Sequence, residues 1–180
     1  MFGPTGREFP AELSLSKADR TIVEAHFSVI EELTEQIEEV EDLIEIKVLE
    51  HSEMQLLLLI PGVGNFTSAV IVAELGEIDR FDCHEEAVSY AGLDPTVHQS
   101  GETEVRGSIS KEDPAVLRWA LIQAATNAVR YDEYLGNFYT RLKERKNHKI
   151  AIVATARKLL VSVFYMLTRE EIYNPPKERA

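Results

Sequence analysis

Residues 58–74 decide the fold, and they read Leu-Leu-Ile-Pro-Gly-Val-Gly-Asn-Phe-Thr-Ser-Ala-Val-Ile-Val-Ala-Glu. Apolar runs flank a proline and two glycines, which predicts two helices joined by a tight turn, the pattern of a helix-hairpin-helix nucleic-acid module. Glycine takes positive φ freely and lets backbone N–H groups approach a phosphate. The second helix would direct its N-terminal amides and the positive end of its dipole at that phosphate. The alternative is a turn that packs two helices and binds nothing. The residues predicted to bind the DNA backbone are Gly62, Val63, Gly64 and Asn65.

The composition is that of a globular protein. The chain has 180 residues, 44% of them hydrophobic, which suits one domain or one domain with an extension. Neither a membrane-length apolar run nor a signal-peptide pattern stands out, so the sequence predicts a cytoplasmic protein without membrane association. The single cysteine, Cys83, has no partner for an internal disulfide and no metal-ligand spacing around it.

The net charge of −12 is unevenly distributed along the chain. Residues 1–60 carry 4 basic and 14 acidic side chains, residues 61–104 carry 1 and 9, and residues 105–180 carry 14 and 8. The last third is therefore the part with a net positive charge, as expected of a surface that binds nucleic acid. It contains a basic run suited to phosphate contacts, for which a solvated helix end is the alternative. The cations of this run are Arg141, Lys143, Arg145, Lys146 and Lys149.

Residues 14–54 are predicted to form a coiled-coil arm. The sequence from Ser14 to Ser52 contains no glycine or proline, and its apolar residues recur at spacings of three and four. Glutamates fill the other faces of this helix. An apolar stripe of such length needs to be covered, so we predict a homo-oligomer held together by the coiled coil. The alternative is one long helix packed along its own domain. The stripe consists of Ile30, Leu33, Ile37, Val40 and Ile44.

The remaining sequence predicts further helices and hence an all-α fold. In this interpretation a coiled-coil helix precedes a helical domain that contains the helix-hairpin-helix and one ordered loop or short hairpin. Residues 1–13 are a flexible lead-in, residues 55–170 form the helical domain, and residues 171–180 are a tail. The ordered loop or hairpin is expected within residues 96–112, where apolar and polar residues alternate weakly.

Two helix starts are predicted from local signals. Asp82 and Glu85 have the spacing of a capping box and would start a short helix. Asp113 would be the N-cap of a later helix, with Pro114 in its first position.

Several motifs, taken in order, resemble those of one protein family. They cover about residues 55–170 and are similar to the C-terminal domain of insertion-sequence transposases of the 110/116/902 type, in which a coiled coil precedes this domain. The motifs are Ile60-Pro61-Gly62-Val63-Gly64, Glu74-Leu75-Gly76-Glu77-Ile78, Arg80-Phe81, Tyr90-Ala91-Gly92-Leu93-Asp94-Pro95, Gln99-Ser100-Gly101, Arg106-Gly107-Ser108-Ile109-Ser110-Lys111 and Ala156-Arg157-Lys158-Leu159-Leu160.

The resemblance implies a DNA recombinase guided by a structured RNA, with a RuvC-like nuclease-fold domain before the coiled coil. It also implies that Ser100 attacks a DNA phosphodiester and forms a transient phosphoserine link. A serine hydroxyl is a weak nucleophile until a base or a cation activates it. Arg106 and Lys111 would then stabilise the negative charge that grows in the transition state. Without the resemblance, all three are ordinary loop residues.

The sequence predicts neither a metal site nor a cofactor in this chain. Its carboxylates lie in helical repeats rather than converging from the strands of a nuclease sheet, and the chain lacks the nuclease-fold domain. A divalent metal is therefore expected only on that domain. Glu102 and Glu104 also make the candidate catalytic loop more acidic than is usual for a loop that binds nucleic acid.

We therefore predict the DNA-binding and catalytic-serine portion of a transposase that cuts and rejoins DNA strands during transposition. The chain alone is expected to be weak or inactive without the nuclease-fold domain. Two other interpretations stay open. The first is a non-catalytic helix-hairpin-helix DNA-binding module or an inactive transposase fragment, and the second is a coiled-coil interaction protein.

Overall fold

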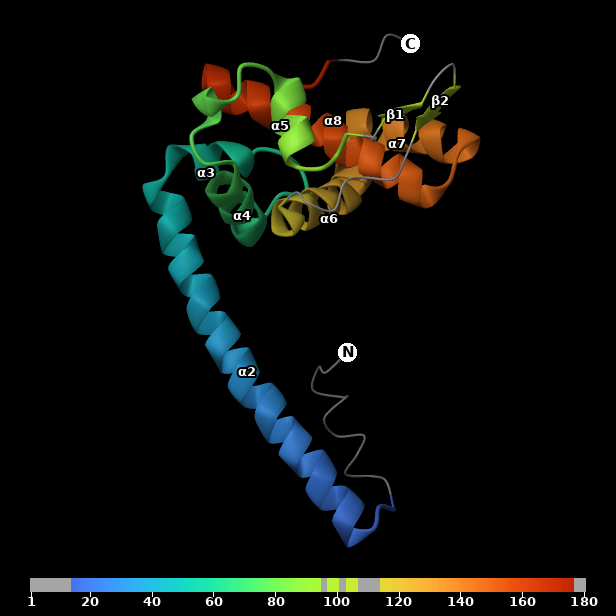
Figure 1. Ribbon diagram of the computed structural model, residues 1–180. Helices are drawn as coiled ribbons and strands as arrows, with labels where there is room; N and C mark the ends of the chain where they lie inside the picture. The colour runs from blue at the N-terminus through green and yellow to red at the C-terminus, as the bar shows by residue number, and fades with distance from the viewer. Residues whose placement is uncertain (1–13, 95–96, 101–102, 107–113, 177–180) are drawn as a thin grey trace. The chain divides into compact units, whose positions relative to one another are not determined.

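The computed structural model describes residues 14–94, 97–100, 103–106 and 114–176. For residues 97–100 and 103–106 it describes the backbone only. It confirms the predicted all-helical fold, and one short hairpin interrupts the helices (Figure 1). The elements are α2 (Lys17–Glu50), α3 (Ser52–Leu57), α4 (Asn65–Leu75), η1 (Ile78–Arg80), α5 (His84–Tyr90), β1 (Val97–Ser100), β2 (Thr103–Arg106), α6 (Ala115–Tyr131), α7 (Glu133–Arg145) and α8 (His148–Arg169).

The chain divides into two compact units, residues 1–43 and residues 44–180. Most of α2 lies in the first unit. Its start is fixed by Ser16, whose Oγ accepts a hydrogen bond from the Asp19 N–H at 3.2 Å and donates one to Asp19 Oδ2 at 2.6 Å. This arrangement satisfies an N–H group that has no partner within the helix, so the chain becomes helical directly after Ser16.

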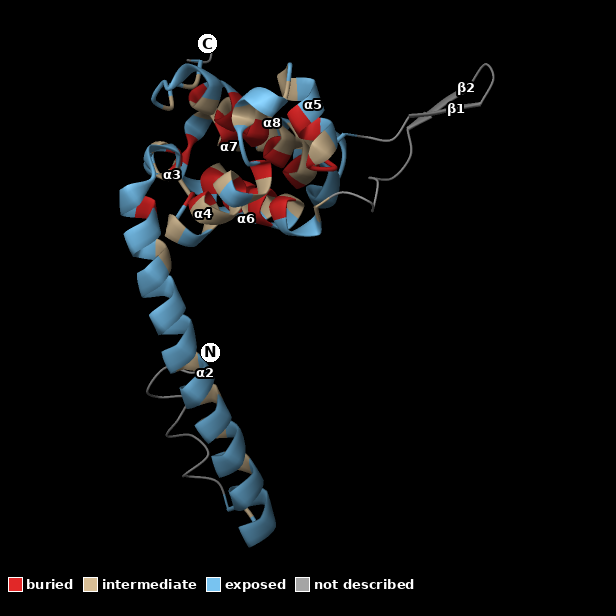
Figure 2. Ribbon diagram, turned by 60° about the vertical axis from the view of Figure 1, so that its left-hand side comes forward, coloured by how far each residue is buried: buried red, intermediate tan, exposed pale blue. Residues whose placement is uncertain are grey.

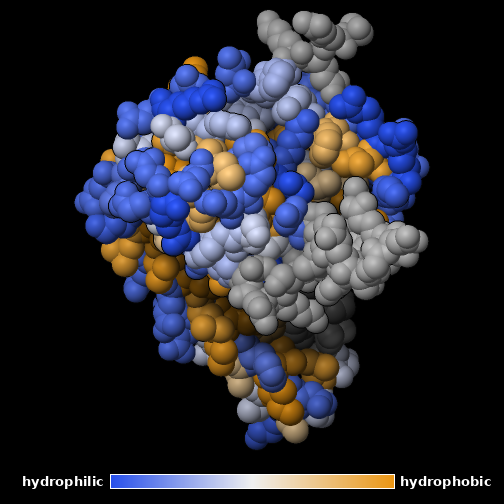
Figure 3. Space-filling view, turned by 45° about the horizontal axis from the view of Figure 1, so that its top comes forward, coloured by the Kyte–Doolittle hydropathy of each residue, from blue (hydrophilic) through white to orange (hydrophobic). Residues whose placement is uncertain are grey.

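The apolar stripe of α2 is largely exposed. Leu33, Ile37 and Val40 expose 52%, 57% and 54% of their surface, and Ile30 and Ile44 are half-buried. Figure 2 shows most of α2 as exposed, and Figure 3 shows orange apolar side chains on the surface. A continuous helix with one apolar face is thus present in the predicted arm, whereas its oligomeric state stays a prediction.

The core of the second unit is built around α8. This helix packs against α3, η1, α5, α6 and α7, while α4 packs against α6. Small side chains let the helices approach one another closely, because Ala151 and Ala156 of α8 and Ala120 and Ala125 of α6 are fully buried. The buried residues in Figure 2 accordingly lie in the interior of this helical unit.

By length and composition α8 could also cross a membrane. A search for uninterrupted apolar runs misses it because Arg157 and Lys158 divide its sequence. However, 56% of its most apolar window is buried inside the protein. Packing within the helical unit therefore explains why α8 is so apolar.

Two helices begin one residue later than their sequence signals predicted. Cys83 is the N-cap of α5, and Glu86, rather than Glu85, reaches back to accept a hydrogen bond from the Asp82 N–H at 2.9 Å. Pro114 is the N-cap of α6 and not its first helical residue. Neither Cys83 nor Pro114 makes a side-chain cap hydrogen bond, so the capping box predicted at Asp82 is present only as the contact from Glu86, and Asp113 lies outside the described residues.

Candidate nucleic-acid interface

A tight turn joins α3 to α4. The Val63 N–H donates a hydrogen bond to the Ile60 carbonyl at 3.1 Å, which closes a four-residue β-turn. Pro61 occupies the second position of this turn, and Gly62, with φ of +92°, occupies the third. Proline fixes φ near −65° and glycine accepts positive φ, so this pair favours a type II turn. We call residues 58–64 the α3–α4 turn.

Gly62 is also required by packing inside the protein. A Cβ atom at this position would lie 2.5 Å from the backbone N of Ala128 and 2.8 Å from the carbonyl carbon of Asn127, both in α6. The turn is therefore pressed against the backbone of α6. Val63 anchors the same turn, since it exposes only 8% of its surface. These two residues have structural roles that their sequence motif alone did not reveal.

Gly64 is the exposed glycine of the turn. Among the described residues nothing lies within 4 Å of the position that its Cβ would occupy, and it forms the N-cap of α4 without a side chain that could bond to the first amides. The first turn of α4 contains no acidic residue. Asn65, the first helical residue, is half-buried, and its carbonyl accepts a hydrogen bond from Ser68 Oγ at 2.9 Å. The positive end of the α4 dipole thus meets solvent at Gly64, a favourable place for an anion.

The basic run forms a second exposed surface where α7 meets α8. Asn147 separates the two helices and is the N-cap of α8, with its Oδ1 accepting from the Ile150 N–H at 3.0 Å. Tyr139 Oη and His148 Nδ1 form a hydrogen bond of 2.9 Å that connects the helices. We call residues 141–149 the α7–α8 corner. Its predicted DNA-binding cations are all exposed, namely Arg141, Lys143, Arg145, Lys146 and Lys149.

The two predicted DNA-binding groups lie apart in the structure. In Figure 1 the α7–α8 corner is at the end of the helical unit away from α3 and α4. The exposed cations of the corner suit phosphates because their charge interacts without requiring a fixed geometry. The α3–α4 turn offers backbone N–H groups instead. An extended polyanion could contact both surfaces, whereas a single phosphate could not.

The candidate nucleophile lies on the hairpin. Ser100 is the last residue of β1 and pairs with Thr103, while Arg106 ends β2 and pairs with Val97. These two predicted catalytic residues are therefore three residue pairs apart along the ladder, about 10 Å between backbones at roughly 3.3 Å per residue. The backbone thus places them on one hairpin but not opposite each other. Lys111 lies outside the described residues.

An ion pair ties the segment before the hairpin to the core helix. Arg157 Nη1 of α8 donates to Asp94 Oδ1 at 2.6 Å, across 63 residues of sequence. The neighbouring Lys158 lies over the rings of Tyr134 and Phe138, at 4.0 and 4.3 Å from their centroids. The ion pair fixes the chain near the point where it leaves the core toward β1, and the Lys158 contacts join α8 to α7. The sequence motifs contained these residues, but nothing in the motifs indicated that Asp94 and Arg157 touch.

Within the described ranges, no group of three or more His, Cys, Asp or Glu side chains could hold a metal ion. The carboxylates that the structure describes are spread over helix surfaces.

The geometry so far is that of a helical domain with two exposed surfaces that suit phosphate. Residues 54–140 match the family described as Transposase IS116/IS110/IS902 family. Through this segment the chain belongs to that family, as its motifs indicated, and Ser100, Arg106 and Lys111 all fall inside the matched residues.

Several proteins are similar to the chain over most of its length. It is 32% identical over 127 residues to the transposase for insertion sequence element IS1111A of Coxiella burnetii, covering 68% of this chain and 35% of the relative. It is 27% identical over 150 residues to a probable family 20 transposase of Pseudomonas aeruginosa, covering 81% and 44%. It is 34% identical over 119 residues to the pilin gene-inverting protein of Moraxella bovis, covering 64% and 36%. The chain therefore spans less than half the length of these relatives.

Proposed function

We propose that this chain is the DNA-binding and catalytic-serine portion of a transposase that cuts and rejoins DNA strands. The observation that carries this proposal is the family segment at residues 54–140, which contains the candidate nucleophile Ser100. Relatives named as transposases and as a gene-inverting protein support an action on DNA. The exposed end of α4 at Gly64 and the α7–α8 corner supply surfaces of the expected chemistry.

In the proposed reaction, Ser100 Oγ attacks the phosphorus of a DNA phosphodiester. One P–O bond to a deoxyribose breaks, a phosphoserine ester forms, and the serine proton leaves with the released sugar hydroxyl. Attack by a sugar hydroxyl of another strand reverses these steps and joins the new ends. The guanidinium of Arg106 and the ammonium of Lys111 would stabilise the charge on the phosphorane-like transition state.

The proposal includes partners beyond this chain. A nuclease-fold domain would supply carboxylates and the divalent metal, and a structured guide RNA would direct the reaction to its target. Self-association through the exposed stripe of α2 would bring two DNA ends together. Each of these partners follows from the resemblance or from the uncovered apolar face.

The test supplies a nuclease-fold domain from a complete relative, together with a candidate RNA, to the full chain and measures a covalent protein–DNA adduct on a denaturing gel. We expect an adduct that protease digestion removes and that Ser100→Ala abolishes, while Ser108→Ala and Ser110→Ala retain it. Binding of DNA without any adduct would favour a non-catalytic module or an inactive fragment. Absence of DNA binding would favour a coiled-coil interaction protein.

A further inference from the structure

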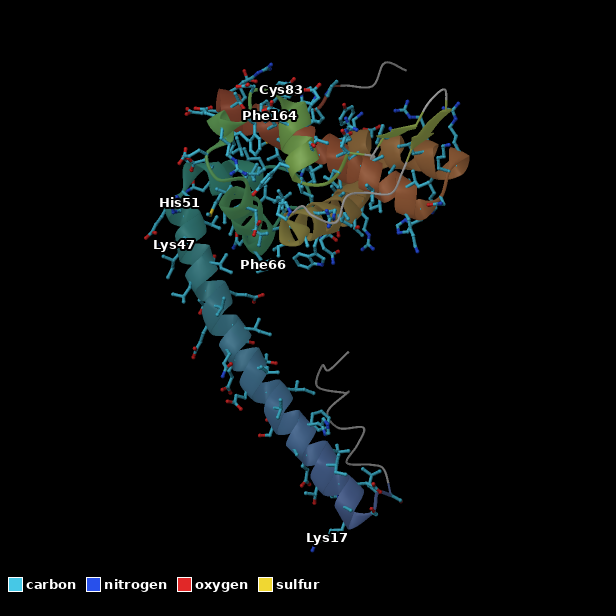
Figure 4. The ribbon with its side chains drawn as sticks, viewed as in Figure 1. Lys17, Lys47, His51, Phe66, Cys83 and Phe164 are labelled. Atoms are coloured by element: carbon cyan, nitrogen blue, oxygen red, sulfur yellow. The ribbon has the colours of Figure 1, made fainter. Side chains whose placement is uncertain are left out.

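An exposed aromatic pair lies where α4 meets α6. Phe66 is in the first turn of α4, Trp119 is in the second turn of α6, and their rings pack edge to face with centroids 6.1 Å apart and an interplanar angle of 78°. The two residues expose 45% and 48% of their surface. Figure 4 shows Phe66 at the outer edge of α4. Large aromatic rings contribute most to folding stability when they are buried, so this exposed pair contributes little to the hydrophobic core.

The pair lies directly beside the α3–α4 turn. Gly64 precedes Phe66 by two residues, and no other described residue comes within 4 Å of its Cβ position. Val116, one turn before Trp119 on the same face of α6, is 52% exposed and extends the apolar surface. A phosphate bound at the start of α4 would therefore have its nucleoside within reach of the two rings.

The helices that carry the pair are poor in negative charge, although the whole chain has a net charge of −12. The described residues of α6 include Arg118 and Arg130 and no carboxylate, and the one charged residue of α4, Glu74, lies at its far end. Glu112 and Asp113 precede α6 but lie outside the described residues. Low negative charge beside an aromatic surface suits a polyanion that also has flat, apolar groups, and this combination is characteristic of single-stranded nucleic acid.

We propose that Phe66 and Trp119 form a stacking platform for unpaired bases of DNA. The inference rests on the proposed DNA binding and adds to it a preference for unpaired over paired DNA. Amides at a helix end hold phosphates and do not distinguish paired from unpaired DNA. A base that has left its duplex can stack on an exposed ring, which stabilises binding by about 1–3 kcal/mol per base. Strand exchange generates such bases, so the platform would retain the opened strand.

The experiment uses the full chain, whose single tryptophan serves as a fluorescent probe. Trp119 is the only tryptophan, so fluorescence excited selectively in tryptophan reports on this residue alone. The chain is titrated with a duplex that contains a central unpaired tract and with a fully paired duplex of the same length and base composition. We expect the unpaired tract to quench Trp119 fluorescence and the paired duplex to bind with little quenching.

Variants measure the contribution of each ring. Affinity for labelled DNA is followed by anisotropy, and Phe66→Ala and Trp119→Ala should each weaken binding to the unpaired tract by about 5- to 150-fold. Binding to the paired duplex should stay unchanged. Tyr131→Ala is the matched control, because Tyr131 is an aromatic residue 73% exposed at the other end of α6. Circular dichroism verifies that each variant keeps its helices.

The outcomes separate this inference from the proposed function. If the chain binds neither duplex, the proposed function fails and the platform fails with it. If both duplexes bind equally without quenching, and both variants bind as the unaltered chain does, DNA binding stands and the platform is wrong. RNA of the same sequence quenching at lower concentration than DNA would overturn the assignment to DNA. Quenching that depends on protein concentration alone would identify a contact between copies instead.

Discussion

Gly62 and Ala128 lie so close that no other residue type fits at position 62. The distance from a Cβ built on Gly62 to the Ala128 nitrogen would be 2.5 Å, and the Gly62 φ of +92° is itself unfavourable for residues with a side chain. One glycine of the α3–α4 turn is therefore required by packing against the backbone of α6. The other, Gly64, has no neighbour within 4 Å of its Cβ position in the part of the chain that the structure describes. Within the same turn, Gly62 is thus required for folding and Gly64 is the candidate for binding.

Gly62→Ala should destabilise the protein by about 2–5 kcal/mol, because it combines overpacking against backbone with a strained φ. Gly64→Ala should cost about 1 kcal/mol or less, the usual effect of alanine at an N-cap. Urea denaturation followed by circular dichroism measures both. Equal stabilities for the two variants would show that the turn does not press against α6.

Gly64→Val tests the binding role, since the branched side chain would cover the first amides of α4 while the fold tolerates it. We expect duplex affinity to fall by at least about tenfold, because a hydrogen bond to a charged group contributes about 1.5–3 kcal/mol. The loss should be similar on unrelated sequences, as phosphates carry no base information. Normal binding by the folded variant would make the turn purely structural.

The α7–α8 corner should contribute through charge. Replacing Lys143 and Lys149 by Gln should weaken DNA binding and lower the slope of log affinity against log salt by about 0.9 for each lost phosphate contact. Lys17→Gln, at the exposed start of α2, is the matched control and should leave the slope unchanged. A slope that stays constant in the double variant would leave the corner as a solvated helix end.

Self-association should depend on the α2 stripe. Leu33 and Ile37 would each contribute about 1.5–3 kcal/mol when buried, so replacing both by Asp should give monomers. Replacing Glu38 and Glu45 by Gln changes the charge of the helix without altering that stripe, and oligomers should persist. Sedimentation velocity distinguishes the two results. An unaltered chain that is still monomeric at tens of micromolar, about that order of concentration, would contradict the prediction.

Tyr173 should make stability fall at alkaline pH. Its hydroxyl is buried near Asp132 but makes no hydrogen bond of acceptable geometry within the described residues. Burial, followed by the negative charge of Asp132, raises the pKa of Tyr173 above its usual range. The neutral form is thus favoured in the folded state, and this contribution is present below about pH 10 and is lost as the pH rises further.

Tyr173→Phe removes both the buried hydroxyl and its titration. At pH 7 the variant should be as stable as the unaltered chain or more stable by about 1 kcal/mol, because an unpaired hydroxyl is costly to bury. Between pH 10 and pH 11 the difference should grow, as measured by urea denaturation at each pH. Tyr131→Phe, with its exposed ring, is the control and should show no such growth. A constant difference across this range would contradict the raised pKa.

Local backbone preferences made the helices and turns predictable from the sequence. The candidate site was less predictable, because it depends on contacts between residues that are distant in sequence. Proline and glycine at 61 and 62 restrict φ by themselves, so the turn could be inferred from the sequence. The partner of Gly62 could not, because Ala128 belongs to a helix 66 residues later and no local pattern encodes that proximity. The Asp94–Arg157 ion pair escaped prediction for the same reason.

Helix ends and strand pairing show a second limit. Glu85 and Glu86 are adjacent carboxylates, and only the three-dimensional path of the chain decides which one reaches the Asp82 N–H. The alternation around Ser100 was too weak to choose between a loop and a hairpin, whereas backbone pairing in the structure gives two short strands. Weak patterns leave such decisions to hydrogen bonds formed across the chain.

The central place of α8 has a consequence for how the protein is made. This helix is synthesised after α3, α5, α6 and α7, yet it supplies the surface against which all four pack. While the ribosome is still translating, these helices have no complete core and keep their apolar faces exposed. The helical unit can close only after Arg169 has left the exit tunnel. A chain released before residue 148 should therefore be a substrate for chaperones or proteases, even though it already contains Ser100 and the entire α3–α4 turn.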